Sequence, residues 1–315
     1  MNFKKVALKI AYFCMNNSLS VILMKYIHFI VNPISGKGKH KIAKQDLEQF
    51  FPSEDYTLVV EYSEYKKHAI TLTRDAVAKK PDIIVACGGD GTIHEVASGL
   101  VNTDIALGIL PVGSGNGLAS NLNIAKDFKK AVALIKNGQP SAIDVGMVNE
   151  YYFFSNMGIG IDAKIIQKYE SMPTRNLSSY VKASLFAAAN YKPHSAIVHC
   201  NGKTFETNPM LFFISNSNEM GYNMSLTPKA SLQDGWLDLL IVPKLNILEQ
   251  MYFGALVLLN KTERFKKASH QLIKEVHVEV SGQDMIPMQL DGEYYQFNEN
   301  KFKISVLQES LRVIV

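Results

Sequence analysis

Four consecutive residues, Gly88, Gly89, Asp90 and Gly91, have types that suit phosphate chemistry. Glycines let backbone N–H groups approach a ligand without a Cβ in the way, and a helix that starts there adds unpaired donors and a positive dipole end. An aspartate repels phosphate, so Asp90 makes sense if it holds a magnesium ion or orients a hydroxyl group. An ordinary strand-to-helix turn with an aspartate cap would use the same residues, so this motif alone leaves both interpretations open.

The residues around this motif predict a strand that ends at the glycines and a helix that begins after them. Residues 83–86 form a continuous apolar run, which is typical of a strand buried on both faces, and apolar residues in 93–100 recur at helical spacing. The same order of strand, glycine-rich loop and helix occurs around 32–39 and 111–117. In a parallel sheet such loops share one carboxyl edge, where α/β proteins bind ligands, so three of them strengthen the prediction of a phosphate site.

Composition limits the classes of protein that fit. A chain of 315 residues favours two domains, and 47% hydrophobic with 20% charged residues is typical of a globular protein. No run of 18 uncharged apolar residues occurs, so no transmembrane helix is predicted. The three cysteines lack a CxxC pair, which argues against a disulfide or zinc framework and for a reducing, cytoplasmic compartment. The net charge of +4 permits weak attraction to an anionic membrane or nucleotide.

The pattern of strands and helices divides the chain. Residues 24–143 alternate strands with helices and predict an α/β nucleotide-binding domain. From about Ile143 short strands follow one another, which predicts a β-sandwich over 144–304. Residues 1–23 are interpreted as an N-terminal extension outside the fold, with a short interfacial anchor as the alternative. The predicted strands are 26–31, 56–62, 83–86, 106–110, 144–148, 151–156, 196–200, 210–215, 237–242, 274–280, 288–290, 303–306 and 311–315.

Helices are predicted at 41–51, 68–79, 128–136, 177–191 and 247–264. The last of these has an apolar stripe from Leu248 to Leu259, followed by basic residues. Such a stripe more often packs in a core, and contact with a membrane surface is the alternative.

Six motifs, in this order, resemble those of the diacylglycerol kinase catalytic-domain family, which includes bacterial soluble lipid kinases and eukaryotic sphingosine and ceramide kinases. The first two motifs alone would also fit NAD kinases and phosphofructokinases. The motifs are Asn32-Pro33-x-Ser35-Gly36, Gly88-Gly89-Asp90-Gly91-Thr92, Pro111-x-Gly113-Ser114-Gly115-Asn116, Gly158-x-Gly160-x-Asp162-Ala163, Asp234-Gly235-x-Leu237-Asp238 and Leu290-Asp291-Gly292-Glu293.

The resemblance implies a three-layer α/β domain followed by a β-sandwich domain, with ATP in the cleft between them and residues 305–315 returning to the first domain. It implies an ATP- and Mg²⁺-dependent kinase that phosphorylates a lipid hydroxyl, with diacylglycerol as the favoured acceptor. The third loop has Asn116 followed by Gly117, where many bacterial relatives have Asn-Asp, and so is closer to the sphingosine-kinase-like branch. A sphingoid-base or ceramide kinase is therefore the alternative. An NAD kinase and a nucleotide-binding sensor are less favoured.

The family's functional residues map onto matching positions of this chain. A structural magnesium ion would be held through oxygens of Ser231, Asp234 and Trp236, and oxygen ligands suit Mg²⁺. The implied partners are ATP and a lipid at a membrane surface, without nucleic acid, and a homodimer is left open. The implied ATP contacts are Asn32, Pro33, Ile34, Ser35, Gly36, Ser63, Gly89, Asp90, Gly91, Thr92, Ile93, His94, Glu95 and Ser114.

Phosphorylation of a hydroxyl group needs a proton acceptor, and the resemblance favours Glu293, with Asp291 as an orienting or magnesium-linked second group and Asp90 as a further candidate. Asp291 and Glu293 are two residues apart, so in an extended strand their side chains would point to one side, whereas Gly292 between them could bend the chain. An Asp-Gly hairpin turn is the structural alternative. The sequence shows no partner for His94, which favours a structural or merely polar role.

Overall fold

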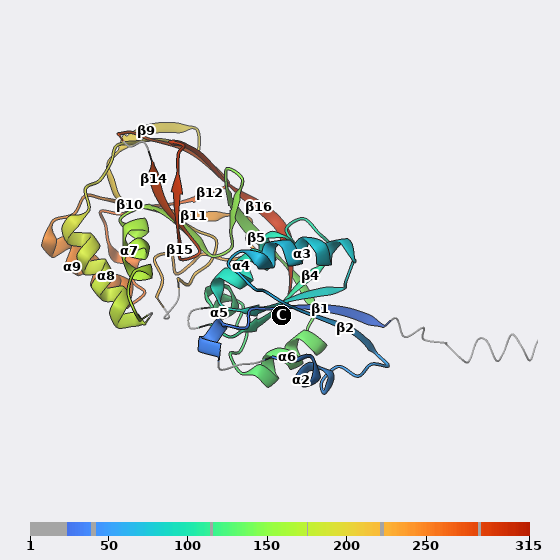
Figure 1. Ribbon diagram of the computed structural model, residues 1–315. Helices are drawn as coiled ribbons and strands as arrows, with labels where there is room; N and C mark the ends of the chain where they lie inside the picture. Colours follow the sequence, from blue (N-terminus) through green and yellow to red (C-terminus); the bar gives the residue numbers. More distant parts are fainter. Residues whose placement is uncertain (1–23, 39–41, 114–115, 175, 221–223, 283–284) are drawn as a thin grey trace, which may run out of the picture.

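The computed structural model describes residues 24–38, 42–113, 116–174, 176–220, 224–282 and 285–315, and the predicted extension 1–23 lies outside the described residues. Figure 1 shows a sheet with helices on both faces and, beside it, a second part built mostly from strands. The predicted fold class, an α/β domain followed by a β-sandwich domain, is confirmed.

Four parallel strands organise the N-terminal part, in the spatial order β2-β1-β3-β4. Their bounds are β1 (Lys25–Val31), β2 (Tyr56–Tyr62), β3 (Ile83–Gly88) and β4 (Ala106–Pro111). Every residue of β3 and β4 is buried, which explains their continuous apolar sequences. The carboxyl ends of the four strands meet at one edge, and the strand order reverses between β1 and β3. Ligands of open α/β sheets bind at such a reversal.

Helices cover both faces of this sheet, with α3 and α4 on one face and α2 and α6 on the other (Figure 1). Apolar residues of α4 face β3 and belong to the core that fills this part. The bounds are η1 (Ser35–Gly38), α2 (Lys44–Glu48), α3 (His68–Ala78), α4 (Asp90–Ser98), α5 (Gly117–Asn121) and α6 (Phe128–Asn137).

The last strand, β16 (Lys301–Ile314), ties the two parts together. It pairs in parallel with β4 through Val313 and Leu107, and antiparallel with β5 (Pro140–Val148). Further along, it pairs antiparallel with β13 (Glu275–Val280), so that one ten-stranded sheet runs through both parts. The remaining strands of this sheet are β6 (Tyr151–Phe153), β8 (Ala196–Cys200) and β9 (Lys203–Thr207). The domain boundary predicted between residues 143 and 144 falls inside β5, and the division itself stays a prediction.

A six-stranded antiparallel sheet faces the far end of the large sheet. Side chains of both sheets, among them Phe212, Val276 and Phe302, form a second core between them. The order is β12-β11-β10-β7-β14-β15, with bounds β7 (Asn156–Gly160), β10 (Pro209–Ser215), β11 (Leu237–Pro243), β12 (Ser269–Ile273), β14 (Ile286–Leu290) and β15 (Glu293–Phe297).

Helices lie on the outer side of the six-stranded sheet (Figure 1). A third apolar cluster joins them to the sheet, with Ala187 of one helix and Phe253 and Leu256 of another packed on Phe213 of β10. The bounds are α7 (Ile161–Glu170), α8 (Leu177–Asn190), α9 (Ile247–Leu258) and η2 (Thr262–Arg264).

Several predicted elements need correction. The helix predicted at 41–51 is only α2, five residues long, and the helix predicted at 247–264 ends at Leu258. The strand predicted at 151–156 is two strands, β6 and β7, whereas those predicted at 303–306 and 311–315 are one strand, β16. Helix α7 and strands β9, β12 and β15 were not predicted.

The favoured core role for the apolar stripe of α9 is wrong, because Leu248 and Met251 are 74% and 70% exposed.

Candidate functional site

The loops that follow the parallel strands lie together at the carboxyl edge of the sheet. Backbone hydrogen bonds join them: Asn32 N donates to Cys87 O at 2.9 Å, Ser63 N to Val31 O at 2.8 Å, and Val112 N to Gly88 O at 2.9 Å. The predicted nucleotide loops after β1, β2, β3 and β4 are therefore neighbours, as parallel pairing requires. Ser114, also predicted as an ATP contact, lies outside the described residues.

The three glycine-rich loops follow β1, β3 and β4, and they are called the first, second and third loop. The side chain of Asn32 fixes the first loop against the second. Its Nδ2 donates to Thr92 Oγ1 at 3.1 Å, and its Oδ1 accepts from Ile34 N at 3.1 Å. Ile34 itself is 80% exposed at the tip of the loop, and Ser35 and Gly36 begin a short 3₁₀ helix. The first loop thus presents its backbone, the exposed Ile34 side chain and the small residues Ser35 and Gly36 at the switch point of the sheet.

The glycines allow two loop backbones to touch. A Cβ added to Gly113 would lie 2.6 Å from Gly89 Cα, closer than any real Cβ contact. A side chain at this position would push the third loop away from the second. These glycines therefore set the spacing of the loops.

Asp90 holds the third loop through its backbone. Its Oδ2 accepts from Asn116 N at 2.9 Å and its Oδ1 from Gly117 N at 2.7 Å. Both carboxylate oxygens thus meet the first N–H groups of α5, where a negative charge is also favoured by the helix dipole. Through these hydrogen bonds Asp90 positions the third loop, a role that the sequence around it did not indicate.

The remaining predicted contacts on α4 face different surroundings. Thr92 and Ile93 are 7% and 2% exposed. The Ile93 side chain belongs to the apolar core and its N–H donates to Gly89 O at 3.0 Å, so both are already engaged within the protein. Glu95 accepts hydrogen bonds from the backbone of Lys67 and Ala69 at the start of α3. Burial, together with the charge of Glu293, raises the pKa of Glu95.

Residues 291 and 292 form a two-residue hairpin turn between β14 and β15, in which Leu290 pairs with Glu293. Asp291 has φ +50° and Gly292 has φ +81°, as expected for the type I′ turn that Asp-Gly pairs favour. The expectation that Asp291 and Glu293 point to the same side of an extended strand is therefore wrong. The turn separates the two carboxylates instead.

The Asp291 carboxylate anchors the turn. It is 11% exposed and accepts from four donors: His94 Nδ1 at 2.9 Å, Phe154 N at 2.8 Å, Ser155 N at 2.7 Å and Asn156 N at 3.1 Å. A carboxylate with this many donors is fixed in position.

His94, for which the sequence showed no partner, links the two parts of the molecule. Its ring bonds Asp291, 197 residues away in the chain, and meets Phe154 edge-to-face with 5.3 Å between ring centroids. Burial lowers the pKa of His94, but the hydrogen bond to Asp291 and the charges of Asp291, Glu293 and Glu95 together raise it above its ordinary value. The His94 ring on α4 thus faces a carboxylate of the sandwich, in surroundings that favour its protonated form.

Glu293 points at the glycine-rich loop. A Cβ added to Gly91 would lie 2.6 Å from Glu293 Oε1, so the carboxylate fills the space that this glycine leaves open. Tyr295 donates a hydrogen bond to Glu293, and burial and the nearby carboxylates raise the pKa of the Tyr295 hydroxyl. The structure therefore brings a carboxylate of the C-terminal half to the first turn of α4.

The predicted metal ligands Ser231, Asp234 and Trp236 lie in the loop before β11. Asp234 Oδ1 accepts from Trp236 N at 3.0 Å, and burial and then the carboxylates of Asp238 and Asp144 raise the pKa of Asp234. Among the residues that the structure describes, no group of three or more His, Cys, Asp or Glu side chains is arranged to hold a metal ion.

Asp144, which sequence reasoning did not select, organises this metal-candidate loop. Its Oδ2 accepts from Gly235 N at 2.7 Å and its Oδ1 from Glu309 N at 2.9 Å. The loop is therefore oxygen-rich and carries mutually repelling carboxylates, a donor set that fits a hard cation such as Mg²⁺ if backbone carbonyl groups complete it.

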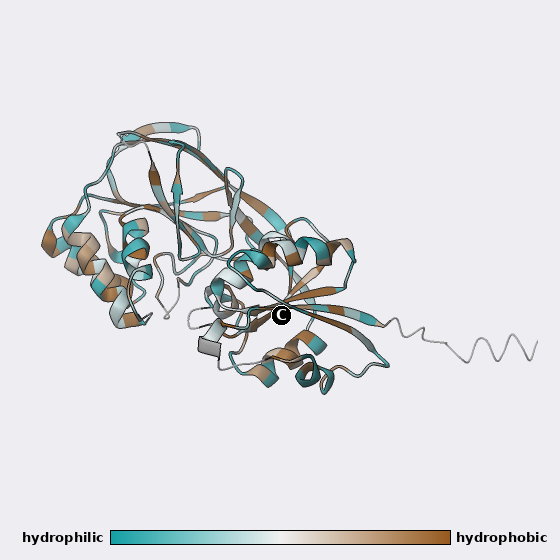
Figure 2. Ribbon diagram, in the orientation of Figure 1, coloured by the Kyte–Doolittle hydropathy of each residue, from teal (hydrophilic) through white to brown (hydrophobic). Residues whose placement is uncertain are grey.

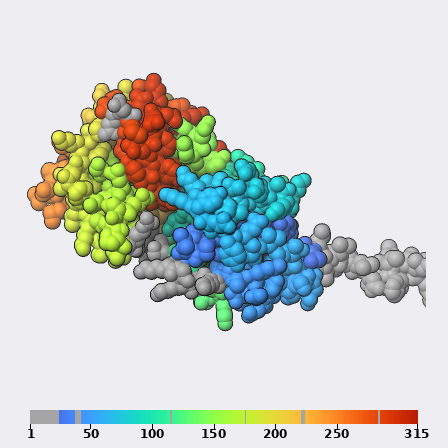
Figure 3. Space-filling model, viewed as in Figure 1, coloured from blue at the N-terminus to red at the C-terminus, as the bar shows by residue number. Residues whose placement is uncertain are grey.

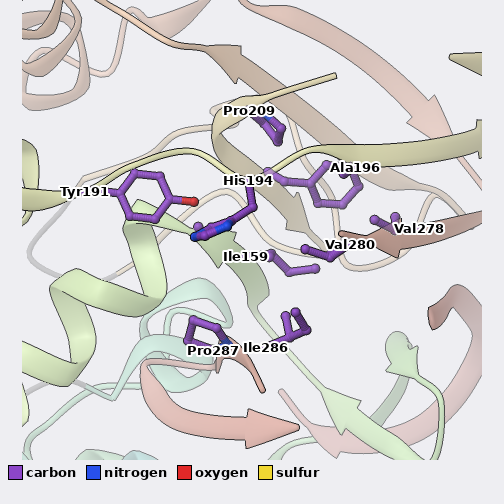
Figure 4. Close-up of a pocket in the computed structure, with 11 residues that line it drawn as sticks. Ile159, Tyr191, His194, Ala196, Pro209, Val278, Val280, Ile286 and Pro287 are labelled. Carbon is purple, nitrogen blue, oxygen red and sulfur yellow. The ribbon is translucent and has the colours of Figure 1, made fainter. Parts of the chain in front are cut away.

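An apolar pocket lies between the two sheets of the sandwich, away from these charged groups (Figure 4). Ile159, Val278, Val280 and Ile286 line it, with Tyr191 at its side. Ile286 begins β14 and Leu290 ends it next to the hairpin turn, so the length of this strand separates the pocket from the turn. Its lining is mostly apolar and also includes His194.

Comparisons with known proteins agree with this geometry. The model for the diacylglycerol kinase catalytic domain matches residues 26–148, and that for the YegS C-terminal NAD kinase beta sandwich-like domain matches residues 155–315. The chain is similar to a diacylglycerol kinase of Bacillus subtilis (strain 168), at 30% identity over 86% of this chain and 90% of the relative. It is 26% identical to a diacylglycerol kinase of Staphylococcus aureus (strain MRSA252), over 86% of this chain and 87% of that one.

The fold is similar to that of solved structures. The crystal structure of a putative diacylglycerol kinase from Bacillus anthracis str. Sterne has a TM-score of 0.74 at 22% identity, covering 92% of this chain and 96% of that chain. Within the described ranges, none of the helices has the length and apolar character needed to span a bilayer.

Proposed function

This chain belongs to the diacylglycerol kinase catalytic-domain family and is a kinase, and we propose that it transfers the γ-phosphoryl group of ATP to the hydroxyl group of a lipid, with diacylglycerol as the acceptor and phosphatidic acid as the product. The observation that carries the proposal is the position of Glu293. Its carboxylate, from the C-terminal half, lies against Gly91 in the glycine-rich turn of the N-terminal half. A phosphate site and a proton acceptor thus face each other.

The loops at the carboxyl edge of the sheet would hold ATP. The residues predicted to contact it lie around the ends of β1, β2 and β3, where backbone N–H groups at the start of α4 suit phosphate oxygens. Asn32 and Asp90 would keep the loops in place through the hydrogen bonds described above. Magnesium bound with the nucleotide would neutralise charge on the transferred phosphoryl group.

Glu293 would accept the proton of the acceptor hydroxyl group as the new P–O bond forms. Asp291 is less suited to this task, because its oxygens already accept from four donors. Asp291 would instead fix the hairpin turn so that Glu293 reaches the first turn of α4. His94 would hold that arrangement from the other side, through its bond to Asp291.

A lipid acceptor is supported by the names of the relatives. The alternatives are a sphingoid base or ceramide, suggested by Gly117 in the third loop, and, less favoured, NAD. A lipid kinase in the cytoplasm would meet its acceptor at a membrane surface, to which it would attach peripherally.

A radiolabelled-ATP assay over a panel of acceptors tests the proposal. The panel contains diacylglycerol, a sphingoid base, ceramide, undecaprenol and NAD, with Glu293→Gln as the inactive control. We expect labelled phosphatidic acid from diacylglycerol, loss of the product in EDTA, and no product from NAD. If labelled sphingoid-base phosphate forms instead, the acceptor is a sphingoid base and not diacylglycerol. Activity on NAD alone would overturn the proposal of a lipid substrate.

The magnesium site is tested separately by Asp234→Asn. If the loop before β11 holds Mg²⁺, the wild-type melting temperature rises when Mg²⁺ is added and that of Asp234→Asn does not. An equal rise in both proteins would place the ion elsewhere.

A further inference from the structure

Helix α9 exposes a continuous apolar stripe to solvent. Ile247 and Leu248 are each 74% exposed, Met251 is 70% exposed and Tyr252 is 53% exposed. Ala255, Leu258 and Leu259 continue the series and are also exposed. Positions separated by three and four residues lie above one another on a helix, so these side chains form one stripe, which we call the α9 face.

The opposite side of the same helix is buried. Phe253 and Leu256 are 7% and 5% exposed and pack in the cluster that covers the outer side of the six-stranded sheet. The helix therefore packs on the sheet through its buried side alone, and the α9 face takes no part in this packing. Figure 2 shows α9 at the left edge of the molecule, coloured mostly as hydrophobic, and Figure 3 shows the same edge as an outer surface.

The neighbouring helix repeats the pattern. Leu177, Val181 and Leu185 of α8 are spaced four residues apart and are 41%, 40% and 67% exposed. Both helices contribute to the same buried cluster under them, through Ala187 of α8 and Phe253 of α9, so they lie in one layer. An exposed apolar surface over two helices of one layer is larger than scattered surface residues produce.

The charge around this stripe is positive. Residues 244–268 contain five basic and two acidic residues, a net charge of +3 in a chain whose total is +4. Lys261, Arg264, Lys266 and Lys267 directly follow α9, while Glu249 is already paired with Lys267. Helix α8 adds Lys182 and carries no acidic residue.

We propose that the α9 face docks on an anionic lipid bilayer. Exposed apolar side chains with a basic rim match the acyl boundary and the negative headgroups of such a surface. A second copy of this chain fits less well, because a two-fold contact through this face would place the basic segment after α9 near its own copy. The proposal extends the proposed function, since an enzyme that phosphorylates a lipid must reach it at the bilayer.

Co-sedimentation with vesicles tests docking without any catalytic step. The full chain is mixed with vesicles of phosphatidylcholine alone or of equal phosphatidylcholine and phosphatidylglycerol, without ATP. The test variant is Leu248→Asp with Met251→Asp. The matched control is Ile70→Asp, which replaces a 48% exposed apolar residue of α3 in the N-terminal part. Melting temperatures establish that the variants are folded.

We expect wild type and the Ile70→Asp control to bind the anionic vesicles, more weakly at high salt, and the double variant to lose about tenfold or more of this binding. Reversing the charge at Lys261 and Lys266 is expected to remove the preference for phosphatidylglycerol. Equal vesicle binding by wild type and the double variant would overturn the proposal. So would a wild-type dimer in solution that the double variant converts to monomers, because the face would then be an interface between copies.

Kinase assays separate this proposal from the proposed function. On short-chain diacylglycerol dispersed below its aggregation concentration, the double variant is expected to match wild type, and on vesicles it is expected to lose activity in proportion to binding. A protein that docks but phosphorylates none of the lipids would refute the proposed function and leave docking standing. A protein that phosphorylates vesicle lipid equally well with and without the intact α9 face would refute docking alone.

Discussion

The glycine-rich loops of the N-terminal half and the hairpin turn of the C-terminal half use their carboxylates differently. In the loops, both oxygens of Asp90 accept backbone N–H groups of the next loop. In the turn, Asp291 is saturated in the same way by four donors, whereas Glu293 faces Gly91 and accepts a hydrogen bond from Tyr295. Two of these carboxylates therefore hold backbone in place, and the third faces the glycine-rich turn.

This difference indicates what each half supplies. The parallel sheet brings backbone donors to one edge, and Asp90 holds two of the loops together there. The sandwich brings side-chain charge to that edge through one two-residue turn. Neither half alone contains both the glycine-rich turn and the carboxylate opposite it, so the proposed phosphoryl transfer would depend on contact between the halves.

Gly91→Val should break the contact most severely. The backbone of Gly91 is not in the left-handed region, so the substitution is limited by space and not by conformation. Its side chain would displace the Glu293 carboxylate and fill the turn where phosphate is expected. We expect a folded protein without measurable kinase activity, and Gly91→Ala with an intermediate rate. A Gly91→Val enzyme that retains normal turnover would mean that Glu293 does not work from its observed position.

Glu293→Gln sharpens the distinction between the two carboxylates of the turn. Removing a general base lowers kcat by roughly 10²-fold or more, while ATP affinity changes little because the loops are intact. Asp291→Asn should instead lower stability, because a charged acceptor of four hydrogen bonds becomes neutral. Steady-state kinetics and thermal melts of both variants are the measurement. Normal turnover in Glu293→Gln with a dead, folded Asp291→Asn would exchange their roles.

Asp90→Ala tests whether the loop carboxylate acts through position. Two N–H groups would lose their acceptor, at about 1–3 kcal/mol each, and the third loop would lose its position, so kcat/KM for ATP should fall by about 30-fold or more. Asp90→Asn keeps one acceptor and should fall between this variant and wild type. If Asp90→Asn keeps its KM for ATP but loses kcat by 10²-fold, Asp90 takes part in the reaction and not only in loop geometry.

The parallel strands and their loops were predictable because each signal is local. An apolar run such as Ile83–Ala86 followed by glycines predicts the strand, its end and its burial, and parallel pairing then gathers the loops. The Asp-Gly pair likewise allowed a hairpin turn. Local patterns failed where tertiary pairing decides: the strands predicted at 303–306 and 311–315 are one strand, because β16 continues between them with an irregular register.

The contacts that complete the site could not be found in the sequence. His94 and Asp291 are 197 residues apart, and nothing near either residue indicates the other. The approach of Gly91 to Glu293 depends likewise on how the β14–β15 turn meets α4. Exposure of the α9 face was missed for a related reason, since an apolar stripe has the same pattern whether or not another layer covers it.

The smallest effect is expected from the link between the halves, tested by His94→Gln. The raised pKa of His94 in the folded protein means that its protonated form stabilises the fold. This stabilisation is fully present below the unfolded value near pH 6.5 and is lost as pH rises through the folded pKa. Losing a hydrogen bond to a charged group costs about 2 kcal/mol, so His94→Gln should be less stable than wild type by about that amount at pH 6, and by less at pH 9.

The matched control is His277→Gln, which removes an imidazole–carboxylate pair at 2.9 Å between side chains that are 51% and 47% exposed. An exposed pair contributes little, so urea unfolding should give nearly equal free energies for this variant and wild type at both pH values. A pH-independent difference for His94→Gln would mean that its ring contributes packing against Phe154 and not charge. Glu293 lies beyond Asp291 on the same turn, and in His94→Gln this turn keeps its three backbone donors. The charge interpretation therefore also requires that kcat falls less in His94→Gln than in Glu293→Gln.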